Sequence, residues 1–359
     1  MTSRSAIPNP KPAILRRVLR PVLVAAILVL SGSGCVRSLQ RPLPADEEDQ
    51  LRLAAVQFLK ESAFSDEPVI RMHAIEALQE VAPVEGLPCI EANIENGYAG
   101  VSFAALMALG TLRQAEFLER IRIRAESSDP NVVIAALFAM HRMGDQKRTS
   151  ELADFLFNNE DARVRANAAV AIGRLGEPKS AKILRRALDK EAKISPKLQI
   201  LEALAAFGDR NAIDRLIAFA YDPRPDVVAI ALQCLANANC DKAEMLYVSR
   251  LQSSVYPESR LQAARGLGRL GRDDGLDVAL AYLRFNSPET GRSNDPPEQQ
   301  IARVRALAAL ALEAIGSPQA LGPLKDAFFT PDQAADVRLT VARAAIKIID
   351  RRGRRPSTN

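Results

Sequence analysis

The stretch DARVRANAAVAIGRLGE, from Asp161 to Glu177, decides the fold of this 359-residue chain. Related stretches begin at Gly97, Asp129, Tyr256 and Ala302. The apolar residue that ends the core of each copy recurs every 31 or 32 residues, at Leu78, Leu109, Met140, Ile172, Leu204, Leu235 and Leu267. Leu312 follows 45 residues later, and a last copy centres near Ala345. A period of 20–50 residues is typical of a solenoid or another repeat array.

Each copy predicts two helices. The first half places apolar or alanine residues at helical spacing, as in Val164, Ala168 and Ile172. Glycine then follows, where a helix end needs a left-handed residue, at Gly144, Gly176, Gly208, Gly271 and Gly316. The second half resumes the helical period, as in 181–188 and 212–219. No segment shows strand alternation between hairpin turns, so an all-α protein is predicted.

The pattern V-R-x-x-A-A-x-A-L-G-x-L-G resembles the HEAT repeat, in the short variety known as the phycobilisome-lyase-like HEAT repeat. The resemblance implies a right-handed α-solenoid of about nine helical-hairpin repeats, and we predict no catalytic residues in it. It also implies that the motif arginines join ion pairs and hydrogen bonds between repeats. These are Arg71, Arg165, Arg260, Arg305 and Arg338. Proteins built from HEAT repeats generally resemble scaffolds that bind other macromolecules. The resemblance therefore leads us to expect a protein or peptide partner along the second helices of the repeats.

The N-terminus predicts export. Residues 1–20 hold five basic residues and no acid, Val22–Leu30 is apolar, and small residues precede Cys35. The apolar run is shorter than the roughly 20 residues of a transmembrane helix. Cys35 resembles the lipidated cysteine of a bacterial lipoprotein, although Gly32 stands where a lipobox prefers leucine. Cleavage to a soluble exported protein and an uncleaved anchor remain alternatives.

These signals divide the chain into a signal peptide (1–35), a tether (36–50), a solenoid (51–350) and a basic disordered tail (351–359). The helix predicted at 51–59 is too close to the Leu78 repeat to be a full unit, so we expect it to cap the array. An excess of 13 residues maps to a polar, proline-rich insertion at 286–299. Such insertions either line a binding face or are tolerated surface loops.

Charge argues against nucleic acid. The whole chain carries +5, but the five basic residues of the signal peptide account for all of it. The tail holds four more arginines, which leaves 36–350 near −4. Because a nucleic-acid-binding solenoid needs a basic stripe, no nucleic-acid partner is predicted. The tail itself is either a solvated end or a contact for anionic headgroups or cell-wall polymers.

Sequence patterns known from enzymes do not lie in the structural context that their chemistry needs. Residues 266–271 spell GxGxxG, yet they close a predicted helix, whereas a dinucleotide site follows a strand. The two histidines, His73 and His141, lie in no metal-binding pattern, and the His-Glu pairs of HEAT-like iron hydroxylases are missing from the sequence. No cofactor, metal or small-molecule substrate is therefore predicted, and no residue for bilin-lyase activity can be identified.

Three cysteines remain if Cys35 is lipidated. Cys234 and Cys240 could form a disulfide across a helix end, or could be two partly buried thiols. Cys89 is expected to be buried.

These observations favour an exported, lipid-anchored, periplasm-facing scaffold at the membrane of a bacterial envelope. The alternatives are a soluble periplasmic adaptor, an enzyme accessory or bilin-lyase-like protein, and a purely structural envelope protein.

Overall fold

The structure is a computed structural model that describes residues 42–288 and 296–353. The signal peptide with Cys35, the first part of the tether, residues 289–295 of the insertion and residues 354–359 of the tail lie outside the described residues. Within the described ranges the fold is all helical, as predicted, and no strand occurs. No helix there combines the length and the apolar character needed to cross a membrane.

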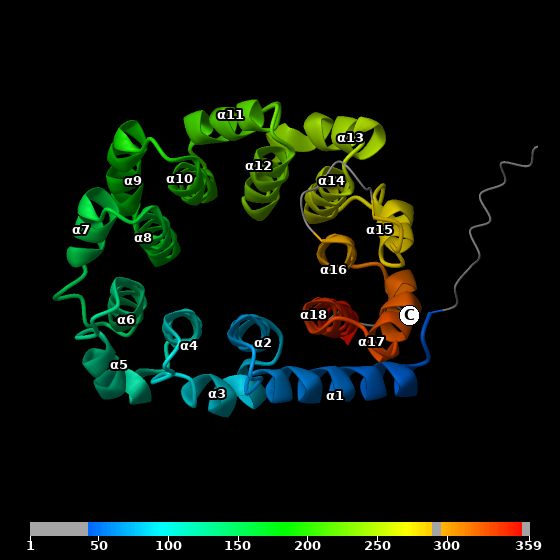
Figure 1. Cartoon of the computed structure of the whole chain (residues 1–359), viewed down its shortest axis with the longest axis horizontal. Coiled ribbons are helices and arrows are strands. Elements are labelled where there is room, and N and C mark those ends of the chain that lie inside the picture. Colours follow the sequence, from blue (N-terminus) through cyan, green and yellow to red (C-terminus); the bar gives the residue numbers. More distant parts are fainter. Residues whose placement is uncertain (1–41, 289–295, 354–359) are drawn as a thin grey trace, which may run out of the picture. The chain divides into compact units, whose positions relative to one another are not determined.

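The helices of the repeat unit form two layers (Figure 1). The inner layer holds the first helix of each repeat: α2 (Pro68–Val81), α4 (Ala99–Leu112), α6 (Pro130–Arg142), α8 (Ala162–Leu175), α10 (Ile194–Ala206), α12 (Pro225–Asn237), α14 (Pro257–Arg269), α16 (Pro297–Ile315) and α18 (Ala335–Gly353). The outer layer holds α1 (Ala45–Ser62), α3 (Pro83–Glu91), α5 (Leu118–Arg124), α7 (Glu151–Asn158), α9 (Pro178–Lys190), α11 (Arg210–Phe219), α13 (Glu244–Ser253), α15 (Leu276–Tyr282) and α17 (Leu321–Phe329). Short 3₁₀ turns precede α5, α13 and α17.

Alanine allows the inner helices to approach one another. Every residue of the recurring pairs Ala104–Ala105, Ala135–Ala136, Ala168–Ala169, Ala263–Ala264 and Ala308–Ala309 is almost completely buried. Three glycines bring successive inner helices closer still. A Cβ on Gly110 would lie 2.7 Å from the Cα of Ala139, and one on Gly268 would lie 2.6 Å from the backbone nitrogen of Ile315. The third, Gly173, approaches Ala203 in the same way.

The predicted glycine turns are confirmed. Gly144, Gly176, Gly208, Gly271 and Gly316 all have φ between +70° and +98°. Two repeats without glycine place another residue in the same region, Arg113 at +55° and Asn239 at +50°. Asparagine tolerates this region better than most residues, which explains how the divergent repeat around 236–240 keeps its turn.

The inner layer closes on itself. Each inner helix packs against the next, and α18, the last of them, packs against α2, the first. In the outer layer, α1 packs against both α18 and α2. Most of the other outer helices likewise contact the inner helices before and after them, so α1 is the second helix of the unit that α18 begins. Helices α18 and α1 therefore form the ninth helical pair, although they are the last and the first helices of the described sequence.

The prediction that the helix at 51–59 caps an open end of the array is wrong. A cap protects an open end of an array, whereas α1 buries Leu51, Ala55 and Leu59 in a core that includes residues of α18. The physical reason is that α18 has an apolar face, and α1 covers it in the way that the other outer helices cover theirs. The helix also begins at Ala45, so the tether predicted at 36–50 is shorter, and α18 runs three residues beyond 350.

Ion pairs reinforce the contact between α18 and α1. Arg52 donates to Asp350 across 2.8 Å, and Arg352 pairs with Glu48. On the same side, Lys325 of α17 pairs with Glu47. We call this junction of α17 and α18 with α1 and α2 the seam.

Candidate partner-binding surface

The turns between helices lie on two edges of the ring. Turns from an inner helix to its outer partner hold the five left-handed glycines, and we call this edge the glycine rim. Turns from an outer helix to the next inner helix lie close to the motif arginines, and we call this edge the arginine rim. The second helices, along which a partner was expected, form the outer layer (Figure 1).

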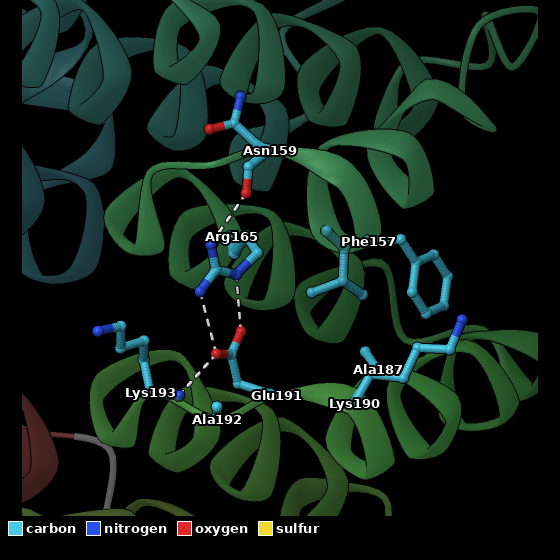
Figure 2. Close-up of a pocket in the computed structure, with 9 residues that line it drawn as sticks. Phe157, Asn159, Arg165, Ala187, Lys190, Glu191, Ala192 and Lys193 are labelled. Atoms are coloured by element: carbon cyan, nitrogen blue, oxygen red, sulfur yellow. Dashed lines mark hydrogen bonds and ion pairs between the residues drawn. The ribbon is translucent and has the colours of Figure 1, made fainter.

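Arg165 shows what a motif arginine does (Figure 2). Its Nε and Nη2 donate to the two carboxylate oxygens of Glu191 at 2.7 and 3.0 Å. Its Nη1 donates to the backbone oxygens of Asn159 and Glu160 at 2.9 and 3.0 Å. The hydrogen bonds from Arg165 lower the pKa of Glu191 despite its burial, and those to Glu191 raise the pKa of Arg165. All the polar groups of this pair are occupied within the protein.

Three of the other motif arginines bind carbonyl groups near the preceding outer helix. Arg71 donates to the oxygen of Ser65, Arg260 to that of Leu251, and Arg305 to that of Phe285 at 2.8 Å. A helix C-terminus leaves its last carbonyl groups without partners, so these contacts satisfy them or the turn that follows. The structural role implied by the HEAT resemblance is confirmed at these positions.

Arg338 departs from the pattern and lies at the seam. Its guanidinium stacks 4.2 Å from the ring centroid of Phe58 in α1 and 5.2 Å from that of Phe328 in α17. The two rings meet edge to face at 5.6 Å. The motif arginine of the last repeat thus joins three helices, one of which comes from the other end of the helical unit.

A groove of about 260 Å³ lies over the Arg165–Glu191 pair (Figure 2). Phe157, Lys190 and Lys193 line it, and the Lys190 ammonium lies 5.6 Å from the centre of the Phe157 ring. The Lys193 backbone N–H donates to Glu191 at 2.8 Å. The charged groups beneath the groove are thus paired with each other at a junction between repeats.

A second cavity, of about 310 Å³, lies on the glycine rim between α7 and the start of α9. His141, close to its wall, contacts Glu177 through Nε2 at 3.1 Å and Thr149 through Nδ1 at 2.8 Å. The three residues come from α6, the turn before α7 and the turn before α9. They join consecutive turns, which is a structural role. His73 is exposed on α2, and no group of three potential metal ligands occurs among the described residues.

Charged side chains also connect the inner helices at the seam. Arg343 of α18 lies 3.0 Å from both Glu80 of α2 and Glu313 of α16. Lys347 pairs with the same two carboxylates at 2.6 and 2.9 Å. Burial acts to raise the pKa of Glu313, but Arg343 and Lys347 hold it below its ordinary value. Sequence reasoning missed this network because its members are up to 267 residues apart.

The three cysteines in the described part of the chain are buried thiols. Cys89, Cys234 and Cys240 are all free in the structure, so it contains no Cys234–Cys240 disulfide. Burial raises the pKa of the Cys234 thiol well above its ordinary value, and nearby Glu202 adds to the effect. A thiol whose pKa is raised by burial is a poor nucleophile.

The GxGxxG sequence has a packing explanation. Gly266 and Gly268 lie within α14, and Gly271 follows its end in the left-handed conformation. A Cβ at Gly266 would lie 2.6 Å from the ring of Tyr247, and Gly268 meets α16. The motif follows from helix packing and from the repeat turn, as the sequence context indicated.

Large apolar side chains are exposed on the arginine rim. Phe329, Phe64 and Tyr98 are 55%, 54% and 60% exposed, and Val69 beside Phe64 is 57% exposed. They occupy three consecutive turns around the ring, α17 to α18, α1 to α2 and α3 to α4. Sequence reasoning has no means of recognising these residues as neighbours, because the closure of the ring alone places Phe329 beside the first repeats.

Comparison with known proteins defines the class of the repeats. Residues 118–205 match the profile of HEAT repeats, and residues 304–330 match that of the PBS lyase HEAT-like repeat. These two segments therefore match HEAT repeats in sequence. No curated protein sequence matches it significantly.

Solved structures with similar helical arrangements include the complex of CpcE and CpcF of phycocyanin lyase from Nostoc sp. PCC7120. That match has 20% identity and a TM-score of 0.38, and covers 66% of this chain and 92% of the other. Human deoxyhypusine hydroxylase in complex with glycerol matches with 18% identity and a TM-score of 0.34, and the match covers 87% of this chain and 100% of the other. Kap121p matches with 11% identity and a TM-score of 0.34, and the match covers 80% of this chain and 37% of the other. TM-scores this low do not support any inference from the function of these proteins to that of this chain.

Proposed function

We propose that this protein is an exported, lipid-anchored HEAT-repeat scaffold that binds a protein or peptide partner at a bacterial envelope, without catalysis. The observation that carries the proposal is the run of exposed apolar side chains on the arginine rim. Exposed apolar clusters mark sites of interaction. Protein association is the use that fits such a surface on a repeat scaffold.

The placement of the helix ends supports an anchored arrangement. The outer helix α1 begins at the glycine rim with Ala45, and the inner helix α18 ends there at Gly353. The Arg352–Glu48 pair joins these two ends. With Cys35 as the acylated first residue, the nine residues 36–44 span at most about 30 Å. The arginine rim lies at the other end of α1 from Ala45.

This geometry revises the expected binding surface. The second helices were the expected contact, but the apolar cluster lies in the turns at their C-terminal ends. Residues 286–288 and 296 of the predicted insertion flank α15 and α16 on the same rim, and residues 289–295 lie outside the described residues. We place the partner on this rim and assign no reacting group to the protein.

Acylation is tested by substitution of Cys35. The wild-type protein should incorporate labelled fatty acid and enter the detergent phase, and Cys35→Ala should do neither. Equal partitioning of the two proteins would reject the lipid anchor and favour the soluble periplasmic adaptor.

Partner binding is tested by affinity capture with and without residues 287–297. We expect the deletion to change the captured set. Identical sets would assign the insertion to the tolerated loops. A chromophore coupled on co-expression would instead favour a bilin-lyase-like accessory, and abundance without any discrete partner would favour a structural envelope protein.

A further inference from the structure

Four exposed apolar side chains lie at the seam and in the turn next to it, in three consecutive turns around the ring. We define the seam patch as Phe64, Val69, Tyr98 and Phe329. Phe329 precedes the last inner helix, whereas Phe64 and Val69 flank the turn into the first. Closure of the ring places the turn that holds Phe329 next to the turns that hold the other three residues.

The aromatic residues beneath the patch fix the position of Phe329. Its ring meets that of Phe328 edge to face at 4.9 Å. Phe328 is buried, contacts Phe58 of α1, and is stacked by Arg338 of α18. An exposed aromatic side chain next to rigid buried rings loses little conformational freedom when a partner covers it, which favours binding.

The charges around the patch select the chemistry of the partner. Asp66, Glu67 and Asp332 are exposed in the same turns, and no ion pair to any of them occurs among the described residues. Two motif cations lie at the same turns, and both are engaged within the protein: Arg71 donates to the backbone oxygen of Ser65 at 2.6 and 2.9 Å, and Arg338 stacks on Phe58 and Phe328. An apolar surface with acidic neighbours attracts a cationic partner and repels an anionic one.

From these observations we infer that the seam patch docks a segment of a partner protein that carries apolar side chains beside lysine or arginine. The inference rests on the proposed scaffold function and names the chemistry of its partner. Acidic neighbours disfavour both an anionic membrane surface and a nucleic acid at this position.

The probe is a fluorescein-labelled amphipathic peptide of leucine and lysine, and the comparison is a peptide of the same length made of leucine and glutamate. Fluorescence anisotropy with the Cys35→Ala protein should show binding of the lysine peptide, with at least about tenfold weaker binding of the glutamate peptide. Phe64→Ser and Tyr98→Ser should each weaken lysine-peptide binding by about tenfold, since central apolar residues dominate interfaces. Asp66→Asn with Glu67→Gln should weaken it most at low salt.

The matched controls lie on the glycine rim. Val84 and Met245 are 81% and 77% exposed, and Val84→Ser and Met245→Ser should leave lysine-peptide binding unchanged. Absence of lysine-peptide binding, equal binding of both peptides, or equal effects of the controls would overturn the inference. Self-association or binding of anionic vesicles that Phe64→Ser abolishes would overturn it in favour of a second copy or a lipid surface. If these results are negative while Cys35 is acylated and the 287–297 deletion alters partner capture, the scaffold proposal stands and the inference alone falls.

Discussion

Arg52 and Asp350 are 298 residues apart in the sequence, and the Nε of Arg52 donates to the Oδ1 of Asp350 across 2.8 Å. This contact joins the first helix of the ring to the last. It changes how the repeat count is understood, because the ninth helical pair consists of α18 and α1. A ring closed in this way has no exposed end repeat within the described residues, whereas an open array needs polar caps at both ends.

The Arg52–Asp350 pair should show energetic coupling. Arg52→Asp and Asp350→Arg should each lower the free energy of unfolding by about 1 kcal/mol, since both side chains remain about one-third exposed. The double variant should recover part of that loss, and hydrogen exchange of α18 should follow the same order. Strictly additive losses would show that the two charges do not interact.

The Arg165–Glu191 pair should stabilise the junction between repeats. Both side chains are mostly buried, so Glu191→Gln should lower the free energy of unfolding by about 2 kcal/mol at neutral pH. Exposed Glu160, in the turn before α8, binds Arg165 only through its backbone oxygen and provides the control, so Glu160→Gln should have little effect. Chemical denaturation measures both.

The contribution of Glu191 should depend on pH with a defined sign. Hydrogen bonds from Arg165 lower its folded-state pKa below the ordinary value of 4.5. The stability that it contributes is therefore fully present above pH 4.5 and is lost as the pH falls through the lower, folded-state value. The difference between wild type and Glu191→Gln should shrink over that range, and a difference that grew on acidification would contradict the assignment.

The two kinds of helical glycine should respond differently to alanine. Gly268→Ala should destabilise the protein by about 1–3 kcal/mol, because the new Cβ would meet the backbone of Ile315 at 2.6 Å. Gly322 lies in α17, and a Cβ added there would meet nothing within 4 Å, so Gly322→Ala should be neutral or slightly stabilising. Thermal unfolding of both variants is the measurement. Equal effects would mean that helix propensity, not close packing, explains Gly268.

The sequence predicted the repeat and most of its local chemistry. The 31–32-residue spacing located the inner helices, and the glycine after each motif marked the left-handed turns at Gly144, Gly176, Gly208, Gly271 and Gly316. Both features are local, since each depends on residues within one unit. The role of the motif arginines followed from the family resemblance, and Arg165 has the implied contacts.

Closure could not be predicted in the same way. The faces of α1 and α18 that meet are ordinary amphipathic faces, and the sequence does not encode the cumulative angle between successive repeats in any local pattern. Arg338 illustrates the limit: its position in the motif was recognised, but its stacking on Phe58 depends on an element 280 residues away in the chain. The seam patch was missed for the same reason.

The distance between α1 and α18 in solution tests the account most directly. Spin labels on exposed Gln50 and Gly353 should give one short, narrow distance distribution, close to that of a reference pair at Arg269 and Asp277. The reference pair occupies corresponding positions, at the end of the inner helix and the start of the outer helix of one unit. An open array of nine units at about 9 Å per unit would separate Gln50 from Gly353 by as much as about 80 Å. A long or broad distribution would contradict the closed ring.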